Sequence, residues 1–192
     1  TRYPLVTGVQ TCALPICLYL FDAEPQVTHG GSMRYIVSKD KSVSSSARLR
    51  ELMREEDSFG VKEHQNYNEF VRKCYLGKSE LINLLRKLKK EGKSVAGYAA
   101  TSKSTTILNF CQIGPELIEA IYDSTPEKIG CITPGSRIPI KSQDLLLENP
   151  PDYIVLFAWN HREEILMKER KRLPKGQKWI SFVPKVEIFS GD

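Results

Sequence analysis

The sequence predicts an α/β fold: a Rossmann-like, doubly wound and mostly parallel sheet, preceded by a short strand and helix segment and by a long helix. Three observations lead to this prediction. Runs such as residues 152–157 (DYIVLF) are almost continuously apolar, which is typical of strands buried on both faces. In the second half of the chain such runs alternate with segments of helical periodicity. Parallel strands joined through helices follow right-handed crossovers, and these favour a Rossmann-like arrangement.

The first predicted elements are two strands and a helix. Residues 18–22 (LYLFD) and 33–37 (MRYIV) have the apolar and aromatic content of strands, and a glycine-containing turn at 28–32 separates them. A helical pattern follows, with a serine cluster at 44–46 as its amino-terminal cap and residues 57–60 as its end.

A long helix is predicted over residues 67–91. Gly92 stands where a C-terminal glycine belongs, and Gly77 weakens the middle of the helix without breaking it. The apolar residues that recur on one stripe of this helix are Phe70, Val71, Cys74, Leu81, Leu84, Leu85 and Leu88. The periodicity therefore indicates one continuous amphipathic helix.

The remaining elements alternate between strand and helix. The predicted strands cover residues 94–98, 117–122, 138–140, 152–157 and 179–183, of which the last ends the series. The predicted helices cover residues 102–111, 144–148 and 162–172. We therefore divide the chain into a segment at 1–17, a region of linking strands and helices at 18–92, and a Rossmann-like domain at 93–192.

Bulk composition is that of an ordinary globular protein. The 192 residues are 41% hydrophobic and 27% charged, and the net charge of +5 is spread along the chain. The densest basic cluster, at residues 86–90, lies on a predicted helix and is expected to be a solvated face, since no nucleic-acid-binding module accompanies it. No apolar run approaches the ~20 residues that a membrane-spanning helix requires. We therefore expect neither a nucleic acid nor a membrane as partner.

The cysteines indicate a reducing compartment. Cys12, Cys17, Cys74, Cys111 and Cys131 have neither the spacing of a CxxC pair nor that of a zinc ribbon. An odd count argues against a secreted disulfide framework, so we expect a cytoplasmic protein with reduced thiols. The last three cysteines are expected to be small packed side chains.

Residues 1–17 differ in character from the rest of the chain. They have neither the basic start nor the long apolar centre of a signal peptide. Residues 6–16 (VTGVQTCALPI) resemble the in-frame translation of a sequencing-library adapter. We therefore expect a non-native segment, with the protein proper starting near Leu18 as the tail of something longer. A genuine irregular N-terminal arm is the alternative.

A candidate anion site lies at residues 97–106 (GYAATSKSTT), between a predicted strand and a predicted helix. Of the three glycines of a G-x-G-x-x-G fingerprint, this loop has only Gly97, because Ala99 and Ser102 stand at the other two positions. The loop also differs from a Walker loop, which has a glycine immediately before its lysine, here Lys103. The helix amino end, the Lys103 ammonium and the nearby hydroxyl groups suit a phosphate. A simple helix cap is an equal alternative.

Other candidate residues follow neighbouring predicted strands, where ligands of open α/β sheets bind. Asp123 fits either a ribose hydroxyl or a cap on the next turn. Trp159 could stack on a base or a sugar, or it could occupy a core position beside the last helix. Geometry alone favours the core position. His29, which glycines follow, is an accessible candidate base or simply an exposed residue. No cluster of histidines, cysteines and carboxylates has metal-ligand spacing.

Five motifs in order give the chain a family resemblance. They are THGGSMR (28–34), GYAATSKSTTILNFCQIGPELIEAIYDSTPEK (97–128), PGSRIPI (134–140), PDYIVLFAWNHREEI (151–165) and VPKVEIF (183–189). From about Leu18 to Asp192 the chain resembles the C-terminal domain of S-adenosylmethionine-dependent C-methyltransferases that act on nucleotide-linked deoxysugars.

The resemblance implies a longer enzyme with three parts: a small zinc domain, a Rossmann domain that binds the methyl donor, and the domain seen here. The sugar nucleotide lies between the last two. A base removes the proton next to a sugar keto group, and the enolate attacks the methyl group. The family's catalytic histidine, zinc cysteines and donor loop lie upstream of the similar region. The resemblance therefore implies that this chain is a fragment, inactive alone and without catalytic residues of its own.

The resemblance also implies substrate-binding residues. On the sugar side these are His29, Gly30, Gly31, Ser32 and Arg34; near the phosphates they are Ser102, Lys103, Thr105, Thr106 and Asn109; Trp159 and Asn160 close the cleft. Many relatives have glycine in place of Ala99, which we interpret as a working variant of the loop. Four properties stay open: the identity of the sugar, the nucleotide base, the oligomeric state, and whether the methyl group is transferred to carbon or to oxygen.

Two other functions compete with this one. A stand-alone Rossmann-like nucleotide-binding or sensing module without chemistry is the main alternative. A dehydrogenase is disfavoured, because the second glycine of the fingerprint and a Tyr-x-x-x-Lys motif are absent from the sequence.

Overall fold

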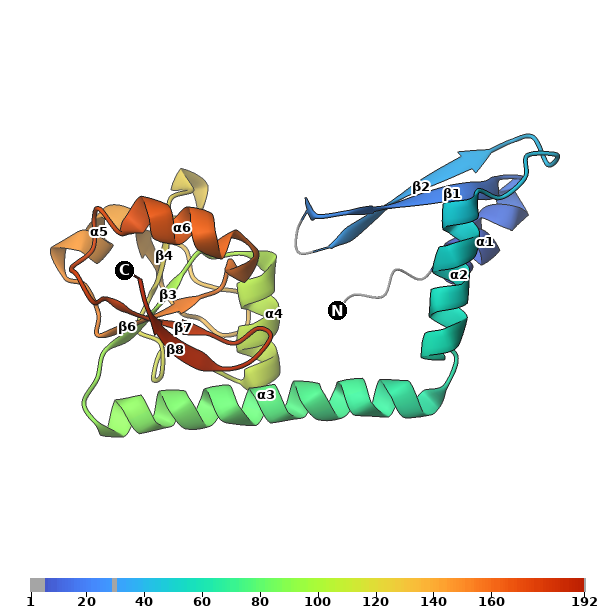
Figure 1. The fold of residues 1–192 in the computed structure, drawn as a ribbon. Coiled ribbons are helices and arrows are strands. Elements are labelled where there is room, and N and C mark those ends of the chain that lie inside the picture. The colour runs from blue at the N-terminus through green and yellow to red at the C-terminus, as the bar shows by residue number, and fades with distance from the viewer. Residues whose placement is uncertain (1–5, 29–30, 192) are drawn as a thin grey trace. The chain divides into compact units, whose positions relative to one another are not determined.

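A computed structural model describes residues 6–28 and 31–191, and the chain divides into two compact units, Thr1–Phe70 and Val71–Asp192 (Figure 1). The boundary falls inside helix α3 (His64–Lys90) instead of near Gly92, because residues of the second half of α3 are buried in the core of the second unit. Each unit is described by itself.

The first unit is a β-hairpin with two helices. It contains α1 (Val6–Ala13), the short 3-10 helix η1 (Leu14–Ile16), β1 (Tyr19–Gln26), β2 (Ser32–Ser38) and α2 (Ala47–Phe59). Strands β1 and β2 pair antiparallel, and both predicted strands and the predicted helix are confirmed. Ser46 caps the amino end of α2 by accepting a hydrogen bond from the Leu49 amide, and Gly60 ends the helix with φ +69°.

A small core holds this unit together. Its buried members are Val6, Leu20, Ala23 and Leu49, with Met33, Tyr35, Leu52 and Met53 packed against them. Val6 belongs to α1, so part of the segment at 1–17 packs with the hairpin; its non-native origin stays a prediction.

Asp22 ties strand β1 to the start of α2. Its carboxylate accepts hydrogen bonds from the Ser46 hydroxyl at 2.6 Å and from Arg48 Nε at 3.2 Å. The same guanidinium donates to Glu24 at 2.9 Å. The Arg48 bond and then the Ser46 bond are the main reasons that the pKa of Asp22 falls to about 2.

We expect the Asp22 carboxyl to titrate near pH 2 in the folded chain and closer to its ordinary value of 3.8 in Arg48→Ala. Because the folded state depresses this pKa, the network contributes stability that is present above pH 3.8 and is lost as the pH falls through about 2. An NMR titration of the side-chain carboxyl carbon measures both midpoints. Equal midpoints in the two proteins would contradict the assigned role of Arg48.

The second unit is a six-stranded sheet covered by helices on both faces (Figure 1). After the second half of α3 come β3 (Val95–Tyr98), α4 (Ser102–Cys111), β4 (Ile121–Asp123), η3 (Pro126–Lys128), β5 (Ile140–Ser142), α5 (Gln143–Glu148), β6 (Tyr153–Leu156), η4 (Trp159–His161), α6 (Arg162–Glu169), β7 (Lys178–Ser181) and β8 (Glu187–Ser190). The sheet order is β5-β4-β3-β6-β7-β8. All neighbours are parallel except β7 and β8. The predicted Rossmann-like fold class is confirmed.

Three predictions about strands need correction. Strand β4 begins at Ile121 and not at 117, because the amides of Leu117 and Ile118 both donate to the Gly114 carbonyl in a turn. The strand at 179–183 does not end the series, because the chain turns back and β8 pairs antiparallel with β7. Strand β5 begins at Ile140 and not at 138, since Pro139 has no backbone N–H to donate to a ladder and forms only an isolated bridge with Ile132.

The core lies on both faces of the sheet. Val95 on β3 packs with Leu81, Leu85 and Leu88 of α3, while the alternate residues Ala96 and Tyr98 pack on the opposite face. The predicted stripe of α3 is thus buried in its second half. Phe70 and Val71 in the first half are 63% and 47% exposed.

The cysteine prediction is partly wrong. Cys111 is buried and Cys74 half-buried, but Cys131 is exposed, because it lies in the surface connection between β4 and β5. Its Sγ lies 3.7 Å from the backbone oxygen of Glu127.

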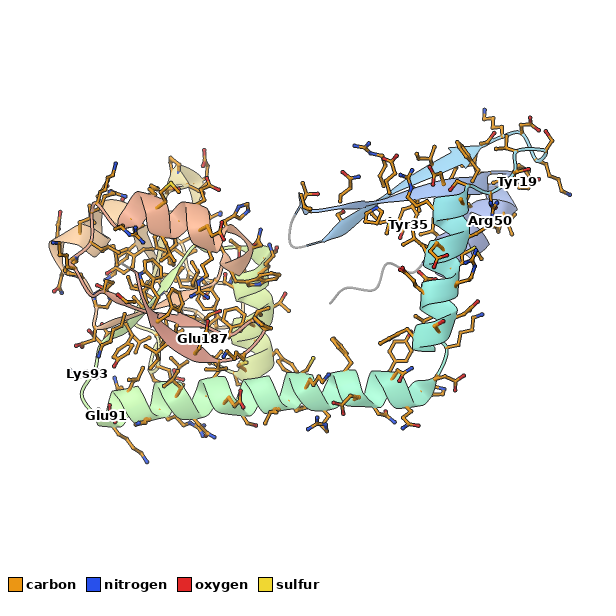
Figure 2. All side chains as sticks on the ribbon, viewed as in Figure 1. Tyr19, Tyr35, Arg50, Glu91, Lys93 and Glu187 are labelled. Carbon is orange, nitrogen blue, oxygen red and sulfur yellow. The ribbon has the colours of Figure 1, made fainter. Side chains whose placement is uncertain are left out.

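Hydrogen bonds join the neighbouring strands β3 and β6 at the amino edge of the sheet. Lys93 lies in the turn between α3 and β3 (Figure 2), and its ammonium lies 3.2 Å from the Asp152 carboxylate. The same carboxylate accepts from the Ser94 amide at 2.9 Å, so the starts of β3 and β6 are joined. Among the described residues, no helix has both the length and the apolar character needed to cross a membrane.

Candidate functional site

The topological switch point of the sheet lies between β3 and β6. Numbered along the sheet, the strand order is 3-2-1-4-5-6, that of a Rossmann fold, and the connections from these two central strands run in opposite directions. Tyr98 pairs with Leu156, and the Phe157 amide donates to the Tyr98 carbonyl at 3.2 Å. The turn into α4 and the turn into η4 therefore leave the sheet at the same edge, where ligands of such folds bind.

The β3–α4 turn is held by a complete capping box. The Thr101 hydroxyl accepts from the Ser104 amide at 3.1 Å, and Ser104 Oγ accepts from the Thr101 amide at 2.9 Å. Ala99 has φ +73°, a left-handed conformation that favours glycine. The structure thus shows that Thr101 and Ser104 cap the helix, while an anion contact stays a prediction. The capping box leaves the amides of Ser102 and Lys103 as the uncapped donors of the first helical turn.

Asp123 is the anchor of this turn. It is 5% exposed, and its Oδ2 accepts from the Ala100 amide at 2.7 Å while Oδ1 accepts from the Thr125 amide at 2.8 Å. Burial raises the pKa of Asp123, but the hydrogen bonds from Thr125 and Ala100 and the charge of Lys128 outweigh it, so the pKa lies below its ordinary value. The structure thus shows Asp123 as a cap; a ribose contact stays a prediction.

Sequence reasoning missed Lys128. Its ammonium donates to the Ala100 carbonyl at 2.9 Å and lies 3.4 Å from the Asp123 carboxylate. It therefore holds the β3–α4 turn in place through contacts with both the Ala100 carbonyl and the Asp123 carboxylate. A cation five residues after a strand-end aspartate was the only signal available in the sequence.

A cavity of about 300 Å³ opens at the amino end of α4. Ala100, Thr101, Ser102 and Thr105 line one side, and the connection between β4 and β5, with Lys128 and Thr133, lines the other. Lys103 lies outside this lining. Its ammonium makes neither a hydrogen bond nor an ion pair within the described ranges, so the positive charge at the helix end is not neutralised.

The other polar residues of α4 are engaged within the protein. The hydroxyls of Thr105 and Thr106 donate to the carbonyls of Thr101 and Ser102 at 3.4 and 3.0 Å. Their predicted hydrogen bonds to phosphate would have to replace these. Of the predicted hydroxyl donors, the one on Ser102 is exposed at the cavity.

Asn109 holds a loop against α4. Its Nδ2 donates to the Thr105 carbonyl at 2.8 Å and to the Pro134 carbonyl at 2.9 Å. Gly135 has φ +77°, and a Cβ there would lie only 1.9 Å from Asn109 Oδ1, so this close approach requires glycine. Asn109 shapes the cavity wall at Pro134, and a phosphate contact stays a prediction.

Trp159 and Asn160 lie on η4, on the other side of the switch point. Trp159 is half-buried and belongs to neither core cluster of the second unit, so the core position that geometry favoured is wrong. Both residues line a cavity of about 380 Å³ together with His161 and Arg162. The carboxamide Oδ1 and Nδ2 of Asn160 are buried without a hydrogen-bond partner within residues 6–28 and 31–191.

The predicted sugar-side residues belong to the first unit. His29 and Gly30 lie outside the described residues. Gly31 has φ +116°, and Ser32 is exposed at the start of β2. The Arg34 guanidinium, 64% exposed, lies 3.1 Å from the Glu24 carboxylate across the hairpin. Their binding roles stay predictions.

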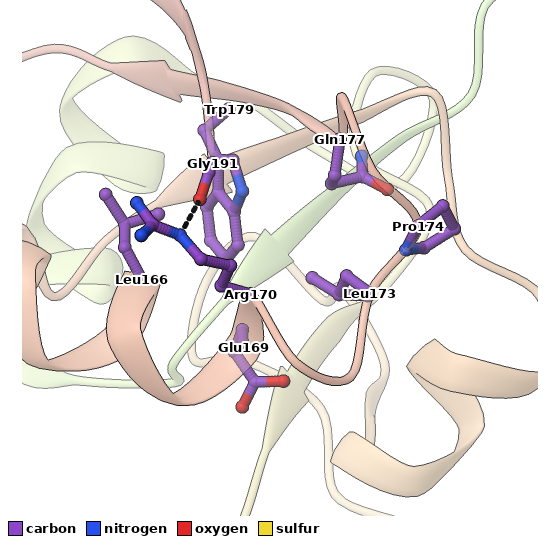
Figure 3. A pocket seen from close by; sticks show the side chains of 8 residues that line it. All are labelled: Leu166, Glu169, Arg170, Leu173, Pro174, Gln177, Trp179 and Gly191. Atoms are coloured by element: carbon purple, nitrogen blue, oxygen red, sulfur yellow. Dashed lines mark hydrogen bonds between the residues drawn. The ribbon is translucent and has the colours of Figure 1, made fainter.

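Two further cavities of the second unit are unsuited to a nucleotide. One of them is lined by Trp179 and by Arg170, which donates to the Gly191 carbonyl (Figure 3). Its volume of about 10 Å³ is too small for a nucleotide. Another of about 360 Å³ lies at the amino edge of the sheet around Asp152, opposite the switch point. No group of three or more potential metal ligands occurs in the part of the chain that the structure describes.

Comparison with known proteins identifies the family of this chain. The sequence model of the C-methyltransferase C-terminal domain matches residues 27–184. C-methyltransferase NovU from Streptomyces niveus is 33% identical over 177 residues, which cover 91% of this chain and 42% of that protein. The chain therefore spans less than half the length of this curated relative. By the extent of the domain match, the chain belongs to the family of C-methyltransferase C-terminal domains.

Proposed function

We propose that this chain is the substrate-nucleotide-binding part of an S-adenosylmethionine-dependent C-methyltransferase that acts on a nucleotide-linked deoxysugar. The observation that carries the proposal is the amino end of α4, which opens onto a cavity at the switch point of the sheet. Two uncapped amides, the helix dipole and the Lys103 ammonium suit the negative charge of a diphosphate there, and within the described residues this ammonium has no other partner.

The β3–α4 turn does not fit the methyl donor itself. The fingerprint that brings backbone close to a dinucleotide-type ligand has only Gly97, and Gly97 lies within β3 against Phe157 instead of in the turn. Ala99 and the Thr101–Ser104 capping box occupy the rest of the turn. We therefore assign donor binding and proton abstraction to another part of a longer protein, and binding of the nucleotide to this one.

The protein should bind nucleoside diphosphates, and Lys103→Ala should raise the Kd for uridine diphosphate by about tenfold. A tenfold change corresponds to about 1.4 kcal/mol, which is within the range of one charge-assisted hydrogen bond. Titration calorimetry with uridine and thymidine diphosphate measures both proteins.

Lys175→Ala is the matched control, because Lys175 is a lysine at the amino edge of the same sheet. Its affinity should equal that of the unmodified chain. An unchanged Kd in Lys103→Ala would reject the role of Lys103, and binding of neither diphosphate nor pyrophosphate by the unmodified chain would reject the function.

A further inference from the structure

The side-chain amide of Asn160 is an anomaly in this fold. Both its oxygen and its nitrogen are buried, and neither has a hydrogen-bond partner in the described part of the chain. Buried polar atoms are nearly always paired, because burial removes them from water without replacing its hydrogen bonds. An amide left unpaired in both atoms therefore calls for a partner that is not part of the fold.

The position of Asn160 indicates where such a partner would come from. Asn160 is the middle residue of η4, two residues beyond Ala158 and at the carboxyl edge of the central strand β6. It lines the cavity of about 380 Å³ beside Trp159. The indole of Trp159 is half-buried and makes no ring contact or hydrogen bond within residues 6–28 and 31–191.

The chemistry of this pair selects one class of partner. A carboxamide presents a donor and an acceptor side by side, which match the donor and acceptor on one edge of a nucleobase. An indole offers a flat apolar surface on which a base can stack. A phosphate would offer acceptors only and would leave the Asn160 oxygen unpaired.

We propose that Asn160 hydrogen-bonds the polar edge of the nucleobase of the bound nucleotide, with Trp159 against the face of the base. The proposal rests on the proposed function, in which the diphosphate lies at the amino end of α4. The two groups stand on either side of the switch point, across which nucleotides bind in folds of this order. Asn160 is then a specificity residue and not a structural one.

The test compares the unmodified chain with Asn160→Leu, which keeps the shape of the side chain and removes both polar atoms. Calorimetry with uridine diphosphate should show at least a tenfold increase in Kd, whereas the Kd for inorganic pyrophosphate should not change. Asn149→Leu makes the same change at an exposed residue between α5 and β6, outside the cavity, and serves as the control; both affinities should be kept.

Thermal unfolding separates this role from a structural one. Asn160→Leu loses no hydrogen bond within the described residues, so its midpoint should equal or exceed that of the unmodified chain. A lowered midpoint together with equal losses for both ligands would mean that Asn160 supports the fold, and would overturn the proposal. So would unchanged affinity for uridine diphosphate, the result expected if water alone pairs the amide. If the unmodified chain binds neither ligand, the proposed function fails too; if it binds pyrophosphate, only the assignment of Asn160 is at stake.

Discussion

Replacing Gly97 by valine is expected to lower the free energy of unfolding of the second unit by about 3 kcal/mol. A Cβ at this position would lie 2.7 Å from Phe157 Cε2 and 3.0 Å from Ile121 Cγ1, and both of those side chains are fully buried. Gly97 is paired on both sides, to Ile121 and Val155, so neither the strand nor its neighbours can move away cheaply. Urea unfolding followed by tryptophan fluorescence measures the change, since Trp159 and Trp179 both belong to the second unit.

Gly77→Ala is the matched control for this substitution. Gly77 lies inside α3 with nothing within 4 Å of the added carbon, so alanine should stabilise the helix by about 0.5–1 kcal/mol. Unfolding of Gly97→Val at the urea concentration of the unmodified chain would show that the Phe157 ring shifts without cost. It would also return Gly97 to consideration as a ligand-binding glycine.

Asp123→Ala is expected to destabilise the second unit by about 3 kcal/mol and to abolish detectable binding of nucleoside diphosphates. The substitution leaves the Ala100 and Thr125 amides without an acceptor and the Lys128 ammonium without its carboxylate. The turn that presents the amino end of α4 would then lose its anchor. Urea unfolding and calorimetry on the same preparation measure the two effects.

Asp152→Ala is the control for Asp123→Ala. Asp152 also accepts from a backbone amide and pairs with a lysine, but its side chain is 38% exposed and lies at the opposite edge of the sheet. The loss there should stay below about 1 kcal/mol, and nucleotide affinity should not change. Equal destabilisation by the two substitutions would contradict the special role of the buried carboxylate.

Acid should weaken the same anchor. Because the pKa of Asp123 is depressed in the folded chain, its contribution to stability is fully present above its ordinary value of 3.8 and is lost as the pH falls below it. The difference in unfolding free energy between the unmodified chain and Asp123→Ala should therefore shrink between neutral pH and pH 3.

Local patterns were enough for most of the fold. Apolar runs and helical periodicity placed β3, α4 and β6 within about a residue of their observed ends, because burial on both faces leaves a direct trace in residue type. The sequence pattern of strand β8 is weaker. It pairs on one side only and alternates exposed with half-buried residues, so its charged and polar members masked the strand.

The candidate site was predicted less completely than the fold. Ser102 and the helix end were found because a helix amino terminus after a strand is a local feature. Lys128 was not singled out, because its importance depends on what lies opposite it in space. Asn160 was named as a cleft residue, but the burial of its amide could not be read from the sequence. For Trp159, geometry alone favoured a core position whereas the family resemblance implied a place at the cleft, because a residue type does not show which face of a turn it occupies.

By itself, the sequence determined the order of the strands and helices from β1 to β7, the family and the polar character of the turn after β3, since each of these depends on neighbours along the chain. Only the tertiary structure decided that Asp123 and Lys128 hold this turn, that Gly97 serves packing, and that one carboxamide at the switch point has no hydrogen-bond partner among the described residues. Those facts depend on contacts between residues distant in the chain, which no local pattern encodes.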